Sequence, residues 1–503
     1  MPNTLIRRVR LVPVAGVPAP DDLVDLRIAA GLVREVAPDL KPGANESVTD
    51  ADGRWAIPGL WDHHVHMGQW AATLSRIDMS GTAGPDEVLA RLRIHLPTLS
   101  AEDRTSVVVG FGHRSATWAR QPTVAELDEA SGTHPVVLVS GDAHNGWLNS
   151  AALALLEAPT TSGALSENDW FPILARLDTL PGAQESAAAA YSAAVAKASA
   201  LGIVGVGDME FGSGYLDWPA RFAAGIKDLR VRAATYREGL DDIVAAGLRT
   251  GDELGESGGL LQMGPLKIIS DGSLNTRTAY CHEPYVDGAS LAHPRGKPNL
   301  SSDELIELCG RATAHGLTMA VHAIGDAAVA QTLDAFEQTG AAGGIEHAQL
   351  VDPTDLARMA KLRVSASVQP AHLLDDRDVT MTCWPDRADR CFPLRSMIDA
   401  GVVLRMGSDA PVSPLDPWLA MAAAVYRSGD DRPPWTLEQA ITPDEALAAS
   451  TDGQTTLAVG SRADIVLLDR DPLAPMSTAA KAADRLRSTR VEATFLAGRE
   501  TFS

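Results

Sequence analysis

Residues 58–66, Pro-Gly-Leu-Trp-Asp-His-His-Val-His, place His64 and His66 two positions apart near the end of a predicted β-strand. Side chains two residues apart in a strand point to the same face, so the two imidazoles face the same way. An Ala-Ile pair leads into the stretch and Pro-Gly punctuates it, which favours a strand end. Imidazole nitrogens are common ligands of zinc and similar divalent metals. The pair supplies half of a tetrahedral metal site, although this spacing alone is weak evidence.

Further residues of metal-binding or catalytic type follow downstream. Each lies in or ends a short apolar run and precedes a turn or a helical pattern, and they are Lys267, His322, His347 and Asp409. Strand-end residues of successive βα units converge at one face of a (β/α)8 barrel, which is where such barrels keep their chemistry. The sequence therefore predicts that these residues meet the histidine pair.

Strand-like runs alternate with helical patterns through the middle of the chain, as in a parallel sheet built from βα units. Eight such runs lie at 60–66, 202–208, 229–236, 264–270, 317–322, 343–348, 363–369 and 402–408. Helices are expected between them, for example over the alanine-rich 184–200 and over 302–315, whose Ser-Ser-Asp-Glu start offers capping residues. The number of runs predicts an α/β fold with a TIM-like (β/α)8 barrel.

The two ends of the chain are both rich in short strand-like runs. Residues 1–57 and 455–503 are therefore predicted to form one small composite β-sandwich, and residues 58–454 the barrel. The stretch 67–183 is too long for a βα loop and carries its own strand and helix patterns. We expect it to fold as an α/β subdomain inserted after the first barrel strand.

Longer strings of sequence resemble one protein family. They are 110–118 (GFGHRSATW), 122–128 (PTVAELD), 142–150 (DAHNGWLNS), 267–279 (KIISDGSLNTRTA), 321–326 (VHAIGD) and 345–350 (IEHAQL). In this order they resemble the amidohydrolase superfamily and, within it, the amidohydrolase-3 or YtcJ-like branch, which includes N-substituted formamide deformylases. The chain departs from that branch at His113, where a Trp is usual, and around 155–180, which is shorter than usual. Both departures lie near the expected substrate side.

The resemblance implies a centre of two divalent ions, most simply zinc. His64 and His66 would hold one ion with Asp409 beside them, and His322 and His347 would hold the second. Lys267 is the puzzling member of the set, because an ammonium is repelled by two cations and has no lone pair to donate. Carbamylation by carbon dioxide would turn this lysine into an anionic ligand that bridges both ions, as it does in the family.

The implied activity is hydrolysis of a C–N bond in an amide, an N-substituted formamide or a cyclic amide through a metal-activated hydroxide. Asp409 would take the proton from the attacking water and pass it to the departing nitrogen. His144, Arg277 and His372 are candidates for orienting the substrate or stabilising an oxyanion.

Other functions remain open. A lactone or ester hydrolase would use the same hydroxide. A deaminase of this family has Glu three residues after the fifth-strand histidine, where this chain has Gly325 followed by Asp326. A noncatalytic metabolite-binding protein is a remote alternative, because none of the six expected ligands is missing.

Composition excludes several classes of partner. The formal charge is −22, from 65 acidic and 43 basic residues, and no Lys/Arg cluster appears, which disfavours nucleic acid and anionic membranes. No apolar stretch approaches the ~18 residues of a membrane span, and the N-terminal region lacks the apolar core of a signal peptide. The four cysteines show no CxxC spacing. We expect a cytoplasmic protein that acts on a small molecule, with a homodimer left open.

Overall fold

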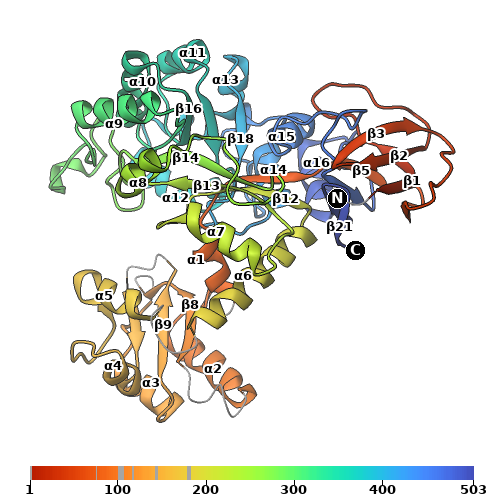
Figure 1. Cartoon of the computed structure of the whole chain (residues 1–503). Helices are drawn as coiled ribbons and strands as arrows, with labels where there is room; N and C mark the ends of the chain where they lie inside the picture. The colour runs from red at the N-terminus through yellow and green to blue at the C-terminus, as the bar shows by residue number, and fades with distance from the viewer. Residues whose placement is uncertain (1–2, 75, 100–106, 116–117, 142–144, 178–182) are drawn as a thin grey trace. The chain divides into compact units, whose positions relative to one another are not determined.

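The computed structural model describes residues 3–503 except 75, 100–106, 116–117, 142–144 and 178–182. Its central feature is an eight-stranded parallel sheet whose strands follow one another in chain order (Figure 1). These strands are β6 (Leu60–Val65), β12 (Ile203–Asp208), β13 (Arg230–Thr235), β14 (Leu261–Ile269), β15 (Met319–Ala323), β16 (Gly343–His347), β17 (Ser365–Val368) and β18 (Leu404–Met406). A parallel bridge between Val65 and Ala410 joins the last strand to the first. The predicted (β/α)8 barrel is confirmed.

Helices connect the barrel strands, and their sequences explain where they begin. Ser301 caps α9 by accepting a hydrogen bond from the Glu304 backbone N–H, while the Glu304 side chain accepts one from the Ser301 N–H. This reciprocal cap is the one that the Ser-Ser-Asp-Glu pattern predicts. The α-helices from residue 183 onward are α6 (Ala183–Ala200), α7 (Gly214–Ala223), α8 (Leu240–Ala246), α9 (Ser302–Ala314), α10 (Asp326–Thr339), α11 (Pro353–Leu362), α12 (His372–Cys383) and α13 (Leu394–Asp399), and, after the last barrel strand, α14 (Pro417–Tyr426), α15 (Pro443–Ala449) and α16 (Ala479–Ser488).

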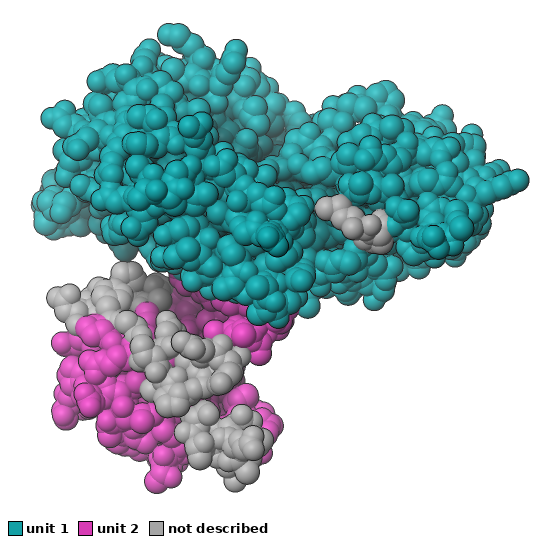
Figure 2. Space-filling view, in the orientation of Figure 1, with its two compact units in different colours: residues 1–67, 195–503 teal, residues 68–194 magenta. Residues whose placement is uncertain are grey.

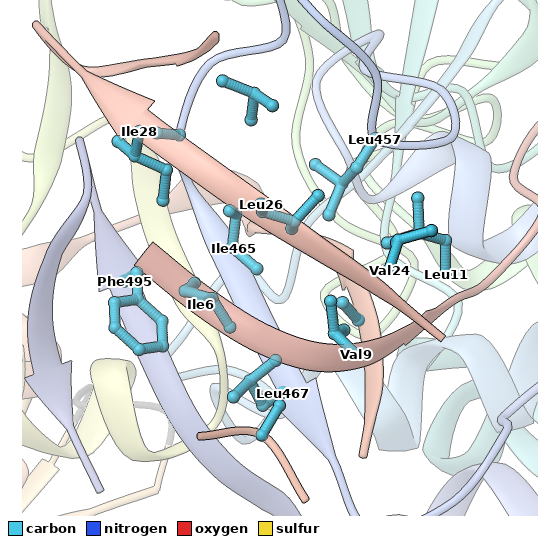
Figure 3. Close-up of a cluster of buried hydrophobic side chains, with 14 of the residues drawn as sticks. Ile6, Val9, Leu11, Val24, Leu26, Ile28, Leu457, Ile465, Leu467 and Phe495 are labelled. Carbon is cyan, nitrogen blue, oxygen red and sulfur yellow. The ribbon is translucent and has the colours of Figure 1, made fainter. Parts of the chain in front are cut away.

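Strands from both ends of the chain build a second β-structure. They are β1 (Thr4–Leu11), β2 (Val24–Ala29), β3 (Leu32–Ala37), β4 (Ser47–Asp50), β5 (Trp55–Pro58), β19 (Ile465–Leu468), β20 (Val491–Leu496) and β21 (Arg499–Phe502). The N-terminal and C-terminal halves join where β19 pairs antiparallel with β5. Apolar side chains from both ends of the sequence pack together in its core, among them Ile6, Leu26, Ile465 and Phe495 (Figure 3). Because β5 leads directly into β6, this structure is continuous with the first barrel strand.

The stretch after the first barrel strand has a sheet of its own. Its strands are β7 (Ile77–Asp78), β8 (Val108–His113), β9 (Val136–Ser140), β10 (Asn145–Leu148) and β11 (Leu165–Ser166). The accompanying helices are α1 (Met67–Leu74), α2 (Pro85–His95), α3 (Val124–Ser131), α4 (Ser150–Leu155) and α5 (Glu167–Leu177). The chain separates into two compact units, one of residues 1–67 with 195–503 and one of 68–194 (Figure 2). The domain limits expected from the sequence stay predictions.

Within the described part of the chain, no helix combines the length and the apolar composition that crossing a membrane requires.

Candidate metal centre

The histidine pair lies where the first and last barrel strands meet. Nε2 of His64 and Nε2 of His66 are each 3.4 Å from Oδ1 of Asp409, and the two rings are 5.6 Å apart. Backbone hydrogen bonds fix this arrangement, because Asp409 N–H donates to the His64 carbonyl at 2.7 Å and His66 N–H donates to the Ala410 carbonyl at 2.9 Å. Two imidazoles and one carboxylate thus converge with their donor atoms within 4.8 Å of one another.

A second group of donor atoms shares the same carboxylate. Ligand atoms of His347, at the end of β16, and His372, at the start of α12, lie within 4.8 Å of each other and of Asp409. The Nε2 atom of His372 is 3.8 Å from Oδ2 of Asp409. The sequence predicts a substrate-orienting or oxyanion-stabilising role for His372, whereas the structure brings it among the candidate ligands.

His322 lies beside this second group without belonging to it. Its ring is 4.5 Å from that of His347, but its Nε2 atom faces the loop after β14, at 3.3 Å from the Gly272 carbonyl oxygen and 3.5 Å from Oδ1 of Asp271. Burial lowers the pKa of His322 to about 3, so its imidazole is neutral at physiological pH. A neutral imidazole is the form that binds metals.

Lys267 reaches the centre from β14. The side chain is buried, and its Nζ atom is 3.2 Å from Nε2 of His64. Burial lowers the pKa of this ammonium, while the carboxylates of Glu346 and Asp409 act in the opposite direction. The pKa of Lys267 is lowered overall, so its amine is neutral more often than the amine of an exposed lysine.

Glu346 is a site residue that the sequence analysis missed. Its Oε2 atom is 2.7 Å from Nδ1 of His64, and both side chains are buried. A carboxylate at Nδ1 accepts a hydrogen bond from Nδ1–H and so keeps the ring proton on that nitrogen, which leaves the lone pair of Nε2 on the side of Asp409 and Lys267. Although burial opposes ionisation, His64 and Lys267 hold the pKa of Glu346 below its ordinary value. The signal in the sequence was a glutamate directly before His347 within a buried strand.

Asp62 was also missed, and it joins the two ligand-bearing strands. Its Oδ1 atom accepts hydrogen bonds from the backbone N–H of His64 at 3.0 Å and of Ser408 at 3.1 Å. Burial raises the pKa of this carboxyl to about 7. The strands approach so closely that a Cβ on Gly407 would lie 2.6 Å from the His64 nitrogen. A buried aspartate two residues before a strand histidine was the available signal.

Two candidate ligands hold an unusual backbone conformation. Asp409 has φ of 56° and His347 has φ of 70°, in the left-handed region that residues other than glycine rarely adopt. Such a conformation costs on the order of 1–3 kcal/mol and persists only where surrounding contacts enforce it. Here the hydrogen bond from Asp409 to His64 supplies one such contact.

The remaining predicted residues lie elsewhere or outside the description. Nε of Arg277 donates to Oδ2 of Asp287 at 2.7 Å, so its guanidinium is engaged in an ion pair. His144 lies outside the described residues. His113, the departure from the family pattern, is buried with its Nε2 atom 3.1 Å from the Leu138 carbonyl oxygen, within the unit of residues 68–194.

Comparison with known proteins agrees with this geometry. A model of the amidohydrolase family matches residues 47–502. A putative amidohydrolase, YtcJ, of Bacillus subtilis is 26% identical over 84% of this chain and 85% of its own length. An N-substituted formamide deformylase of Arthrobacter pascens is 27% identical over 89% of each chain. The crystal structure of an uncharacterized metal-dependent hydrolase from Pyrococcus furiosus, 26% identical, matches with a TM-score of 0.77 over 94% of this chain and 100% of that one.

Proposed function

The chain belongs to the amidohydrolase family, and from that premise we propose that it hydrolyses the C–N bond of an amide, an N-substituted formamide or a cyclic amide. The observation that carries the proposal is Asp409, which lies between two histidine groups at the mouth of the barrel. A similar protein named as a formamide deformylase supports the choice of bond. A cytoplasmic location and a homodimer remain predictions from the sequence.

The residues of the centre fit divalent metal ions. Imidazole nitrogens with a carboxylate form the donor set that zinc prefers. Moreover, Nε2 of His372, the nitrogen nearest Asp409, is buried without a hydrogen-bond partner among the described residues. Buried polar atoms are rarely left unpaired, so this nitrogen indicates a missing ligand or bound group. His64, His66 and Asp409 would hold one ion, and His347 with His322 or His372 would hold the second.

We extend the proposal to Lys267 as a carbamylated residue. A neutral amine adds carbon dioxide to give a carbamate and releases one proton. The buried position of Lys267 favours the neutral amine that this reaction needs. The product is an anion, which would relieve the repulsion between an ammonium and nearby metal ions. The Nζ atom of Lys267 is 3.2 Å from Nε2 of His64, so the carbamate would form beside a candidate ligand.

The protein side chains then divide the work of catalysis. When bound, the ions lower the pKa of a water molecule and polarise the scissile carbonyl. Asp409 would accept the proton of the attacking water at a carboxylate oxygen and deliver it to the departing nitrogen. Although burial opposes ionisation, His64 and the other imidazoles hold the pKa of Asp409 well below its ordinary value, so Asp409 is ionised before the reaction. Glu346 fixes the His64 ring in the tautomer that leaves Nε2 unprotonated.

Two alternative activities, ester or lactone hydrolysis and deamination, can be distinguished from amide hydrolysis. An ester or lactone hydrolase would use the same groups, so only substrates distinguish it. For a deaminase, the acidic residue nearest the expected position is Asp326, whose Oδ1 accepts the His282 N–H at 2.9 Å and whose Oδ2 is 3.3 Å from Arg390. Those contacts give Asp326 a structural role.

The test is turnover of metal-loaded full-length protein on matched N-formyl, N-acyl and cyclic-ureide compounds, with the corresponding esters and aminopyrimidines alongside. Release of amine from at least one amide class, lost in Asp409→Asn, supports the proposal. Turnover of esters alone would make the protein an esterase. Release of ammonia from an aminopyrimidine, with all amides intact, would make it a deaminase.

A further inference from the structure

Exposed apolar side chains lie at or just beyond the carboxyl ends of three barrel strands. Phe211, Ile269 and Val412 are 56%, 36% and 64% exposed. Phe211 follows the end of β12, Ile269 ends β14 two residues after Lys267, and Val412 follows Asp409. Since β18, β6 and β12 are neighbours around the barrel, Phe211 and Val412 belong to the strands on either side of the histidine-bearing β6. Ile269 shares the strand face of Lys267.

The Phe211 ring is held against a candidate metal ligand. It stacks on His66 with ring centroids 5.8 Å apart and an interplanar angle of 28°. On Tyr236, just after β13, it stacks at 4.7 Å and 26°. The Tyr236 hydroxyl donates to the Met209 carbonyl at 2.7 Å, and the Met209 N–H donates to the carbonyl of Val65 at 2.8 Å. These bonds anchor the loop that carries Phe211 to the strand between the two histidines.

The exposed ring of Phe211 lies beside the candidate metal centre, where exposed apolar surface can bind part of a substrate. Large apolar side chains left in water cost free energy, and clusters of them mark binding sites. The ring contacts of Phe211 are with His66 and Tyr236, so its immediate surroundings are aromatic. Arg277, the cation that follows Lys267, is already paired with Asp287. The surroundings of Phe211 therefore suit an uncharged, flat, apolar group.

We propose that Phe211, stacked on Tyr236 and His66, forms a subsite for an uncharged aryl substituent of the substrate, with Ile269 and Val412 exposed at other strand ends of the same face. The inference rests on the proposed hydrolysis at the neighbouring centre and deepens it by naming the class of substrate. An aryl ring would stack on the exposed part of Phe211 while the scissile amide lies among His66 and Asp409. The pair of stacked rings already present, Phe211 on Tyr236, provides the rigid wall that such binding needs.

Equilibrium binding of uncleavable ligands tests the subsite apart from turnover. Isothermal titration of the metal-loaded full chain would compare N-(2-phenylethyl)methanesulfonamide, its N-propyl analogue and N-methanesulfonyl-β-alanine. We expect the phenyl ligand to bind about 10-fold more tightly than the propyl ligand, from stacking and added apolar burial. The carboxylate ligand should bind more weakly than either. Phe211→Ala should abolish the phenyl preference, and Phe211→Leu should reduce it while keeping the affinity for the propyl ligand.

Leu437→Ala provides the matched control, because this leucine is 46% exposed and lies in a short 3-10 helix (Leu437–Gln439) that is hydrogen-bonded to α13 through Gln439 and Ser396. That variant should bind all three ligands as the parent does. Equal affinity for phenyl and propyl ligands, or a phenyl preference that survives Phe211→Ala, would overturn the proposal. So would tightest binding of the carboxylate ligand.

The subsite and the proposed reaction fail in different ways. If no amide is cleaved but the phenyl preference persists and depends on Phe211, the reaction is wrong and the subsite stands. If N-propylformamide and N-(2-phenylethyl)formamide are cleaved with equal kcat/KM, the reaction stands and the subsite is wrong.

Discussion

At the scale of single residues, the candidate metal centre depends on how each candidate ligand is oriented. His64 makes three kinds of contact at once, with Glu346 at Nδ1, with Lys267 at Nε2 and with Asp409. Its ring cannot turn without breaking a buried hydrogen bond to a carboxylate. Orientation of this kind determines affinity, since partners of metal-ligating histidines contribute strongly to metal binding.

Glu346→Gln should weaken metal binding about 10- to 100-fold while leaving the fold intact. The amide is the same size as the carboxylate but fixes the wrong His64 tautomer in half of its orientations. Competition with a chromogenic chelator measures the change, and Glu492→Gln, whose carboxylate pairs with Arg54 in the β-sandwich, is the control. Unchanged metal affinity in Glu346→Gln would remove Glu346 from the positioning role.

Asp409→Asn should lower kcat by ~10² to 10⁴, the usual range for loss of a general base. The asparagine keeps an oxygen for the metal, so metal content should remain largely intact. The loss should be smaller for an activated aryl ester, because its leaving group needs less help. Equal losses on amide and ester together with depleted metal would show that Asp409 acts chiefly as a ligand.

Lys267→Ala should lose most activity, and short carboxylic acids should restore part of it by taking the place of the carbamate. Activity and metal content measured with and without added propionate check both points. Lys297→Ala, at an exposed position, is the control. Wild-type metal content and rate in Lys267→Ala would make the lysine purely structural.

At the scale of elements, the junction of β6 and β18 decides whether the ligands converge. The two strands are joined by the hydrogen bonds of Asp62 and by backbone bonds from residues 64–66 to 409–410. Gly407 allows this approach because any side chain there would meet the backbone of His64 and the carboxylate of Asp62. The first and last barrel strands therefore meet at the point where the candidate metal ligands lie.

Gly407→Ala should therefore force the two strands apart and deplete bound metal. Its Cβ would lie 2.6 Å from the His64 nitrogen and 2.9 Å from Oδ1 of Asp62, closer than real Cβ contacts. The matched control is Gly310→Ala within α9, where the nearest contact is 3.5 Å and the expected change is a gain of roughly 0.5–1 kcal/mol. Elemental analysis and chemical denaturation measure both variants. Full metal content in Gly407→Ala would contradict a close junction.

At the scale of the whole molecule, the two ends of the chain support the first barrel strand. β19 pairs with β5, and β5 continues into β6 across Pro58 and Gly59. The C-terminal strands thereby stabilise a segment more than 400 residues earlier, beside the histidine pair. A core of side chains from both ends holds this arrangement (Figure 3).

Phe495→Ala should cost about 3–5 kcal/mol, the usual effect of removing a fully buried phenylalanine. Phe502→Ala, in the neighbouring strand and only partly buried, should cost less. Urea denaturation followed by intrinsic fluorescence measures both changes. Equal effects of the two substitutions would mean that the sandwich core does not limit stability.

The sequence by itself determined the architecture and the position of most of the centre. All eight predicted runs coincide with barrel strands, and the strand-rich ends form the composite β-structure. These features follow from local periodicity, turn residues and capping patterns, which neighbouring residues specify. Since strand ends of a barrel share one face, the convergence of His64, His66, Lys267 and Asp409 followed as well.

Only the tertiary structure decided which groups touch. Glu346 reaches His64 across 282 residues of sequence, His372 joins His347 and Asp409, and Arg277 turns to Asp287 instead. Such contacts depend on barrel closure and on side-chain rotamers, and no local pattern encodes either. The exposed Phe211 belongs to the same class, because its place beside His66 arises from the hydrogen bond that joins β12 to β6. Periodicity specifies elements, and packing specifies their partners.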